Sequence, residues 1–140
     1  MILEVENWLR TYKKPILVAE YGADTIAGLH QSPEFVFTEE YQTTLMREHF
    51  KAFDYLRANG SFIGEHIWNF ADFMTVQGIT RIVGNRKGIF TRERQPKASA
   101  HLLRHRFHLL AAETDNYPIP EDLMEIVPVY KRARTTHDEQ

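Results

Sequence analysis

PILVAEYG, residues 15–22, is the stretch of the sequence from which the fold can be inferred. After the proline comes a short continuous apolar run, Ile16-Leu17-Val18-Ala19, that is rich in β-branched and branched side chains. A run of this length and composition is typical of a strand buried on both faces, as in a parallel sheet. The run ends on Glu20, so the stretch predicts a buried strand with a carboxylate at its carboxyl end.

Helical patterns lie on either side of this strand. Apolar residues at helical spacing predict a helix over 2–13, which Pro15 ends. Thr38 is a favourable N-cap, and a second helix is predicted from there to Ala58, where Asn59-Gly60 stops it. The apolar residues expected to be buried by this second helix are Tyr41, Leu45, Phe53 and Leu56.

The second half of the chain repeats the order of strand, long loop and helix. A strand is predicted over 61–70, and long glycine-containing loops over 22–37 and 71–94. Pro96 opens a final helix, with an apolar stripe of Leu102, Leu103, Phe107 and Leu110. This alternation indicates a parallel α/β protein in which both loops follow the carboxyl ends of strands. Active sites of (β/α)8 barrels are built there, and two strands are a quarter of such a barrel.

Composition narrows the classes of protein that the chain can represent. With 140 residues, 43% of them apolar, it has enough apolar material for one core and too little for two domains of normal size. The net charge of −2 is inconsistent with a generally basic nucleic-acid binder, and the sequence contains no cysteine. No apolar run approaches the ~20 residues that cross a bilayer. We therefore expect neither nucleic acid nor membrane as a partner.

The charge is unevenly distributed along the chain. Residues 1–112 carry a net charge of +2, and residues 113–140 carry −4. The acidic segment also contains Pro118, Pro120 and Pro128. This shift predicts one α/β unit over 1–112 and an irregular acidic tail over 113–140.

Two acids are candidates for chemistry. Glu20 at a strand end is well placed for catalysis, although a helix cap or a solvated loop carboxylate is the simpler interpretation. Glu65 lies inside the second predicted strand, where a buried pair with His66 or with an arginine is the more natural interpretation.

Other side chains carry weaker signals. The aromatic cluster that begins at Trp68 could stack on a sugar or simply belong to the core. The basic run over 81–97 could hold an anion or form a solvated face. His101 and His105 are one helical turn apart, but no His-Glu-x-x-His motif accompanies them, and we expect neither a metal nor a cofactor.

Four blocks in order give these residues a family context. They are PILVAEYGADTIAG (15–28), FTEEYQ (37–42), GEHIWNFADFMT (64–75) and RIVGNRKGIFTRERQPK (81–97). Together with the helices around them, over residues 2–110, they closely resemble the β-glucuronidases of glycoside hydrolase family 2. The resemblance implies strands seven and eight of a (β/α)8 barrel, the C-terminal part of its catalytic domain.

The resemblance also implies roles for particular residues. Glu20 matches the catalytic nucleophile, and Trp68 matches a tryptophan that lines the sugar site. Asn85 and Lys87 match the Asn-x-Lys motif that binds the glucuronate carboxylate, and Arg81 matches an arginine of the same pocket. The implied activity is retaining hydrolysis of β-D-glucuronides, with the glucuronide as substrate.

One part of the family's machinery has no match in this sequence. The family's acid/base glutamate follows an asparagine at the end of barrel strand four, which would precede residue 1, and no Asn-Glu pair occurs in this chain. We therefore predict that the chain by itself is inactive and that activity needs the other barrel strands. The missing strands would be supplied by association with separate barrel segments or by a homo-oligomer of this chain. The alternative is a catalytically inactive truncated product that acts at most as an association fragment.

The resemblance bears on location as well. Animal members of the family are lysosomal glycoproteins, and Asn59-Gly60-Ser61 is a candidate N-glycosylation sequon, although the same residues suit a helix-stopping turn. The N-terminal residues carry Glu4 and Glu6, which is not the pattern of a signal peptide, so we do not expect this chain as it stands to be secreted.

Overall fold

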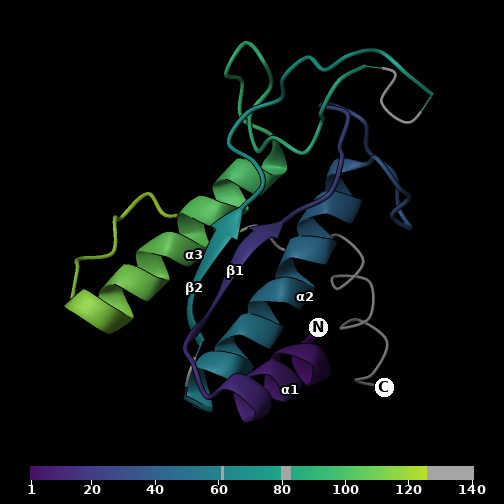
Figure 1. Ribbon diagram of the computed structural model, residues 1–140. Coiled ribbons are helices and arrows are strands. Elements are labelled where there is room, and N and C mark those ends of the chain that lie inside the picture. Colours follow the sequence, from purple (N-terminus) through teal and green to yellow (C-terminus); the bar gives the residue numbers. More distant parts are fainter. Residues whose placement is uncertain (61, 80–82, 126–140) are drawn as a thin grey trace, which may run out of the picture.

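The structure is a computed structural model that describes residues 1–60, 62–79 and 83–125. Its helices and strands alternate along the chain, as the sequence predicts (Figure 1). In chain order they are α1 (Ile2–Tyr12), β1 (Ile16–Tyr21), α2 (Glu39–Ala58), β2 (Phe62–Ile67) and α3 (Ala98–Asp115).

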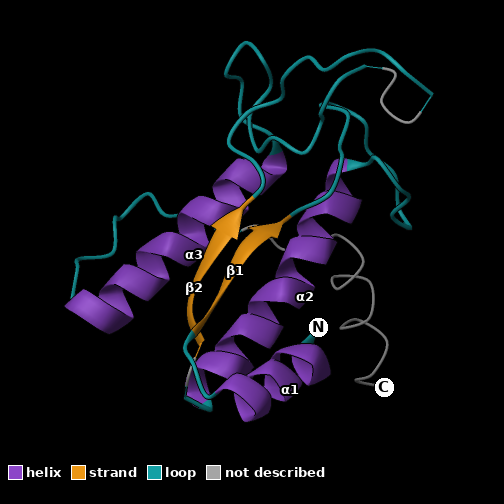
Figure 2. Cartoon of the chain, in the orientation of Figure 1, coloured by secondary structure: helices purple, strands orange, loops and turns teal. Residues whose placement is uncertain are grey.

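The two strands form a parallel pair that the helices cover on one face (Figure 2). Ile16 pairs with Phe62 and Tyr21 pairs with Ile67, with irregularities between them. Helix α2 packs on β2 and on α3. At the centre of this face, Phe53 of α2 stacks on Phe62 at a ring separation of 5.1 Å.

Apolar residues from all five elements meet in one core. Helix α2 begins where Thr38 accepts a hydrogen bond from the Tyr41 backbone, and it ends at the cap residue Asn59, as predicted. Its deepest residues are fully enclosed, which identifies α2 as the central helix of the core. The buried apolar cluster comprises Val5, Tyr21, Met46, Phe50, Phe53, Leu56, Phe62, Ile89, Leu102 and Leu103.

The other face of the sheet is open, which corrects the expectation of a strand buried on both faces. Leu17 is 42% exposed, and Ala19 and Glu20 are also exposed. The apolar run does form a strand, as predicted. Within the described residues, however, helices cover only the face that Tyr21 occupies.

Several element boundaries and buried positions differ from the sequence prediction. Strand β2 ends at Ile67 and not at residue 70, because Asn69 and Phe70 form backbone hydrogen bonds with the 87–90 segment instead. In α3, Phe107 is 46% exposed, so its predicted place on the buried apolar stripe is wrong. At this turn the helix buries Arg106 instead. In α2, the expected core residues Tyr41 and Leu45 are only half-buried, and Met46 and Phe50 are buried in their place.

Candidate active site

The carboxyl ends of β1 and β2 lie against each other. The Trp68 N–H donates to the Tyr21 carbonyl oxygen at 2.9 Å. Gly22 follows with φ +147°, and a Cβ at this position would collide with the Trp68 carbonyl oxygen. Only glycine allows the two backbones to approach so closely here. The residues at the two strand ends, Glu20 and Trp68, are therefore brought to one edge of the sheet.

Glu20 occupies this edge as an exposed carboxylate. Within the described residues, it forms no hydrogen bond and no ion pair. The structure thus excludes the helix-cap interpretation and leaves two others, a solvated carboxylate and the predicted nucleophile. Its predicted role as nucleophile depends on this accessibility.

Trp68 remains accessible at the same edge. It is 38% exposed and meets Phe73 edge-to-face, with ring centroids 6.2 Å apart. Phe73 is 39% exposed and Phe70 is 60% exposed, so the aromatic cluster does not belong to the buried core. Half-exposed aromatic rings of this kind present an apolar face on which a sugar ring can stack.

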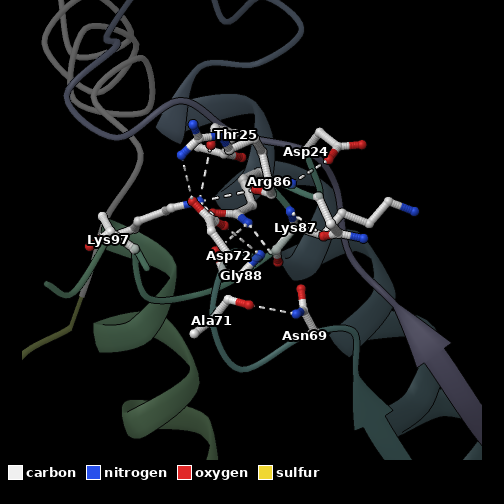
Figure 3. Close-up of polar contacts among 12 residues, drawn as sticks. Asp24, Thr25, Asn69, Ala71, Asp72, Arg86, Lys87, Gly88 and Lys97 are labelled. Atoms are coloured by element: carbon white, nitrogen blue, oxygen red, sulfur yellow. Dashed lines mark hydrogen bonds and ion pairs between the residues drawn. The ribbon is translucent and has the colours of Figure 1, made fainter. Parts of the chain in front are cut away.

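A buried ion pair between Lys97 and Asp72 connects the two long loops (Figure 3). Lys97 donates from Nζ to Asp72 Oδ1 at 2.9 Å, and to the carbonyl oxygens of Thr25 and Arg86, each at 3.0 Å. The same Asp72 oxygen accepts the Gly88 N–H at 3.0 Å. Burial lowers the pKa of Lys97, and the hydrogen bond to Asp72 offsets part of that effect. We call Asp72 and Lys97 the clasp.

Asn85 is enclosed by the clasped loops. It is 1% exposed, and its backbone exchanges hydrogen bonds with Phe73. Its side-chain Oδ1 accepts the Lys87 N–H at 2.9 Å. The Asn85 side chain therefore fixes the backbone of Lys87, which lies two residues further on. Its contact with a substrate remains a prediction.

Within the described residues, the side chain of Lys87 has no polar partner. Its backbone carbonyl accepts the Asn69 N–H at 3.2 Å, which places Lys87 beside the end of β2. Within the described residues, its ammonium has no hydrogen bond and no ion pair. By contrast, Asp72 holds both Lys97 and Arg86, the latter at 3.5 Å. The basic run is therefore more than a solvated face, because part of it is internal and Lys87 stays available.

Two predicted residues remain, Arg81 and Asn59. Arg81 lies outside the described residues, so its place in the pocket stays a prediction. Asn59 is exposed, and its Nδ2 donates to the Tyr55 carbonyl oxygen at 2.8 Å, as in a helix-ending turn. Ser61, the last residue of the sequon, also lies outside the described residues.

Glu65 is internal, and the predicted pair with an arginine is confirmed. Arg106 approaches both of its carboxylate oxygens, at 2.7 and 2.6 Å. Glu65 is therefore engaged behind the sheet and cannot serve as the second acid at the open edge.

Sequence reasoning missed the residues that hold the loops in place. Glu39 accepts backbone N–H groups from Gly28 and Ala98, at 2.7 and 2.6 Å. Gln42 donates to the Ala23 carbonyl oxygen at 3.0 Å. Each of these hydrogen bonds joins residues that are far apart in the sequence, so no local pattern predicts it. The one available signal was the position of Glu39 in the first turn of a predicted helix, where acids are favoured.

The part of the chain that the structure describes shows neither a cluster of metal-ligating side chains nor a membrane-spanning helix. No group of three or more histidine, aspartate or glutamate side chains gathers there in an arrangement that could hold a metal ion. No helix there is long and apolar enough to cross a membrane.

Comparison with known proteins places this arrangement in a family. The family model described as "Glycosyl hydrolases family 2, TIM barrel domain" matches residues 2–112. The chain belongs to glycoside hydrolase family 2. The expected barrel fold and the β-glucuronidase resemblance are thereby confirmed, and β1 and β2 are neighbouring parallel strands of such a barrel.

Curated relatives that match this family 2 chain are β-glucuronidases. The dog protein is 58% identical over 114 residues, which are 81% of this chain and 17% of the dog protein. The human protein is 55% identical over 115 residues, 82% of this chain and 17% of the relative. The protein of Paenibacillus borealis is 54% identical over 115 residues, 82% and 18%. The chain thus spans about a sixth of the length of these relatives.

Solved β-glucuronidase structures contain the same local fold. The enzyme of Dictyoglomus thermophilum superposes with a TM-score of 0.72 at 50% identity, covering 76% of this chain and 18% of that chain. The Ruminococcus gnavus enzyme in complex with uronic deoxynojirimycin superposes with a TM-score of 0.69 at 42% identity, covering 76% and 18%.

Proposed function

We propose that this chain carries the nucleophile and the carboxylate-binding residues of a β-glucuronidase active site, which hydrolyses β-D-glucuronides with retention. One observation carries the proposal. Within the described residues, the Glu20 carboxylate at the end of β1 and the Lys87 ammonium, whose backbone is bonded to Asn69 just after β2, form no hydrogen bond or ion pair, whereas Asp72 is paired with Lys97 and Arg86. A family 2 relationship with β-glucuronidases supports it.

In the proposed reaction Glu20 attacks the anomeric carbon and forms a covalent glycosyl-enzyme. A second carboxyl group, about 5–5.5 Å away in retaining glycosidases, protonates the leaving oxygen and then activates water. Glu65 is excluded from this role by its pair with Arg106. The family's Asn-Glu acid/base pair has no match in these 140 residues, so the second carboxyl group would come from outside them.

Selectivity for glucuronides follows from charge. A glucuronide differs from a neutral glucoside by one carboxylate, and the Lys87 ammonium can form a charge-assisted hydrogen bond with it. Asn85 fixes the Lys87 backbone, and Arg81 would join the same pocket. Trp68 would line the sugar ring. No cofactor is required by this chemistry.

The open face of the sheet bears on how such a site is completed. Leu17 is 42% exposed there, on a strand whose composition is that of a buried one. We expect the isolated 140-residue chain to be inactive and to gain activity only with further barrel strands, contributed by other segments or by other copies. The second candidate function, an inactive association fragment, rests on the same open face.

The location of the protein stays a prediction. A lysosomal site would fit the dog and human relatives, whereas the relative from Paenibacillus borealis is bacterial and is 54% identical.

A hybrid enzyme tests the proposal. The aligned segment of the dog β-glucuronidase is replaced by that of this chain, and hydrolysis of a fluorogenic aryl β-D-glucuronide is compared with that of the matching β-D-glucoside. We expect the glucuronide to be cleaved, and cleavage to be lost in Glu20→Gln. Glu34→Gln, which alters a carboxylate of the neighbouring loop with no hydrogen bond or ion pair in the described residues, is the control. A folded but inactive hybrid, or an active Glu20→Gln hybrid, would overturn the proposal.

A further inference from the structure

Behind the sheet lies a cluster of four charged side chains that the proposed reaction does not use. We call Asp54, Arg57, Glu65 and Arg106 the charge box. Arg106 Nη2 lies 2.6 Å from Glu65 Oε2 and 3.0 Å from Asp54 Oδ1. Arg57 lies 2.9 Å from Asp54 and 3.5 Å from Glu65. Two carboxylates and two guanidinium groups thus neutralise one another between β2, α2 and α3.

The Glu65–Arg106 pair at the centre of the charge box is buried, whereas Asp54 lies at its exposed rim. The side chains of Glu65 and Arg106 are 5% and 8% exposed. The Arg106 guanidinium also lies over the Phe50 ring, 4.3 Å from its centroid. Burial alone would lower the pKa of Arg106, but its hydrogen bonds to Glu65 and Asp54 outweigh this and hold the pKa above its usual value. Its planar donors reach both carboxylates at once, so the box presents Glu65 in one fixed orientation.

One neutral side chain connects the charge box to strand β1. The Tyr21 hydroxyl donates to Glu65 Oε1 at 3.2 Å. The Tyr21 ring is 5% exposed and packs against His49 and Phe53, with centroid distances of 5.6 and 5.1 Å. Burial, followed by the Glu65 carboxylate, raises the pKa of Tyr21 well above its usual value, so the phenol stays protonated and donates.

Tyr21 occupies the junction at which the proposed nucleophile is placed. It follows Glu20 directly, and its carbonyl oxygen accepts the Trp68 N–H at 2.9 Å. The β1–β2 register shifts between Val18 and Tyr21, which is the interval that contains Glu20. Regular strand pairing is therefore interrupted at Glu20, and the next paired residue toward the carboxyl end is Tyr21.

We propose that Tyr21, held by Glu65 and Arg106, is a positioning residue that sets the orientation of Glu20 for attack. The proposal rests on the proposed function, because it presumes that Glu20 is the nucleophile. Since Tyr21 acts through its hydroxyl, removal of that one oxygen should disturb the strand end and leave the packed ring in place. A purely structural role would instead lower the stability of the whole core without altering the strand end selectively.

The first test uses the full 140-residue chain. Amide hydrogen exchange is measured by NMR in the unaltered chain and in Tyr21→Phe, with the centre of α2 as internal reference. The Trp68 amide donates to the Tyr21 carbonyl oxygen. We expect it to exchange about tenfold faster in Tyr21→Phe, because that variant loses the hydrogen bond from the Tyr21 hydroxyl to the charged Glu65 carboxylate. The α2 amides should keep their rates. Equal acceleration at both places, or none at Trp68, would overturn the proposal.

A matched control is present in the chain. The Tyr55 hydroxyl donates to Glu6 Oε1 at 3.1 Å, in an exposed tyrosine–glutamate pair unconnected with Glu20. Tyr55→Phe should leave the exchange of Trp68 unchanged. Should Tyr21→Phe not fold, Glu65→Gln weakens the acceptor that Tyr21 shares with Arg106 and also turns an amide toward an Arg106 donor, so its exchange rates are read relative to those of α2, and an acceleration at Trp68 greater than that in α2 is expected. A Trp68 rate that does not change relative to α2 in Glu65→Gln would then count against the proposal.

The second test measures kinetics in the hybrid enzyme. We expect Tyr21→Phe to lower kcat for the aryl glucuronide about tenfold with KM unchanged, since a misdirected nucleophile weakens the chemical step and not binding. A change in KM alone, or no change, would contradict positioning. If the unaltered hybrid is inactive, the proposed function fails, whereas the exchange experiment still decides whether Tyr21 fixes the strand end.

Discussion

Within the described residues, helices cover one face of the β1–β2 sheet and leave the other face exposed. On the helix-covered face Phe53 and Phe62 stack and Tyr21 is 5% exposed. On the open face Leu17 is 42% exposed, and Glu20, the neighbour of Tyr21, is exposed and unpaired within the described residues. Adjacent residues of one strand therefore lie in opposite surroundings, with Tyr21 in the core and Glu20 exposed. The covered face supplies the packing, and the open face carries the exposed carboxylate that we propose as the nucleophile.

The largest expected difference between the two faces is in stability. Phe53→Ala removes a fully buried ring and should lower the free energy of unfolding by about 3–5 kcal/mol. Leu17→Ala on the open face should cost less than about 1 kcal/mol, because the side chain is already half in water. Urea unfolding followed by circular dichroism measures both. Equal losses would mean that the open face is packed in solution.

Two lysines give a second contrast of the same kind. Lys97→Met leaves Asp72 buried without its principal partner and should destabilise the chain by about 3–5 kcal/mol. Lys87→Met removes an ammonium that has no partner in the described residues, so the melting temperature should not change, while the hybrid enzyme should lose its preference for glucuronides over glucosides. A stability loss in Lys87→Met, or retained preference, would break the distinction between clasp and binding group.

The parts of the fold with local signals were predictable from the sequence. The N-cap Thr38 and the stop at Asn59 are set by residues within one helical turn, and α2 begins and ends there. The end of β2 was not predictable, because it depends on hydrogen bonds between Asn69 and the 87–89 segment. The open face of β1 was missed for a related reason, since an apolar run predicts a strand but not which faces are covered.

In the candidate site, too, motifs predicted some residues, and others depend on contacts between distant segments. Glu20 and Lys87 were identified from their motifs, and the structure finds both without partners in the described residues. The burial of Lys97 was not foreseen, because it requires Asp72 and the carbonyl oxygens of Thr25 and Arg86, which lie in three separate segments. Asn85 was expected to face a substrate, and its enclosure became visible only in the folded loops.

The smallest expected effect concerns the loop that follows Glu20. His30 Nδ1 lies 2.7 Å from Glu40 Oε1, and this hydrogen bond raises the pKa of His30. A raised pKa means that the pair stabilises the fold below the unfolded value of about 6.5, and that the contribution is lost as the pH rises through the folded value. His30→Gln should therefore cost under about 1 kcal/mol at acidic pH and less at alkaline pH. Thermal unfolding at about pH 5.5 and about pH 8.5 measures the difference, and the opposite order would contradict this assignment.

Covalent trapping tests the central claim, that Glu20 at the open edge is the nucleophile. The hybrid enzyme is incubated with a 2-deoxy-2-fluoro-β-D-glucuronyl fluoride, whose glycosyl-enzyme hydrolyses slowly, and the modified peptide is located by mass spectrometry. We expect a single fluoroglucuronyl group on Glu20, and none in Glu20→Gln. A label on another carboxylate of a hybrid that still cleaves glucuronides would contradict it.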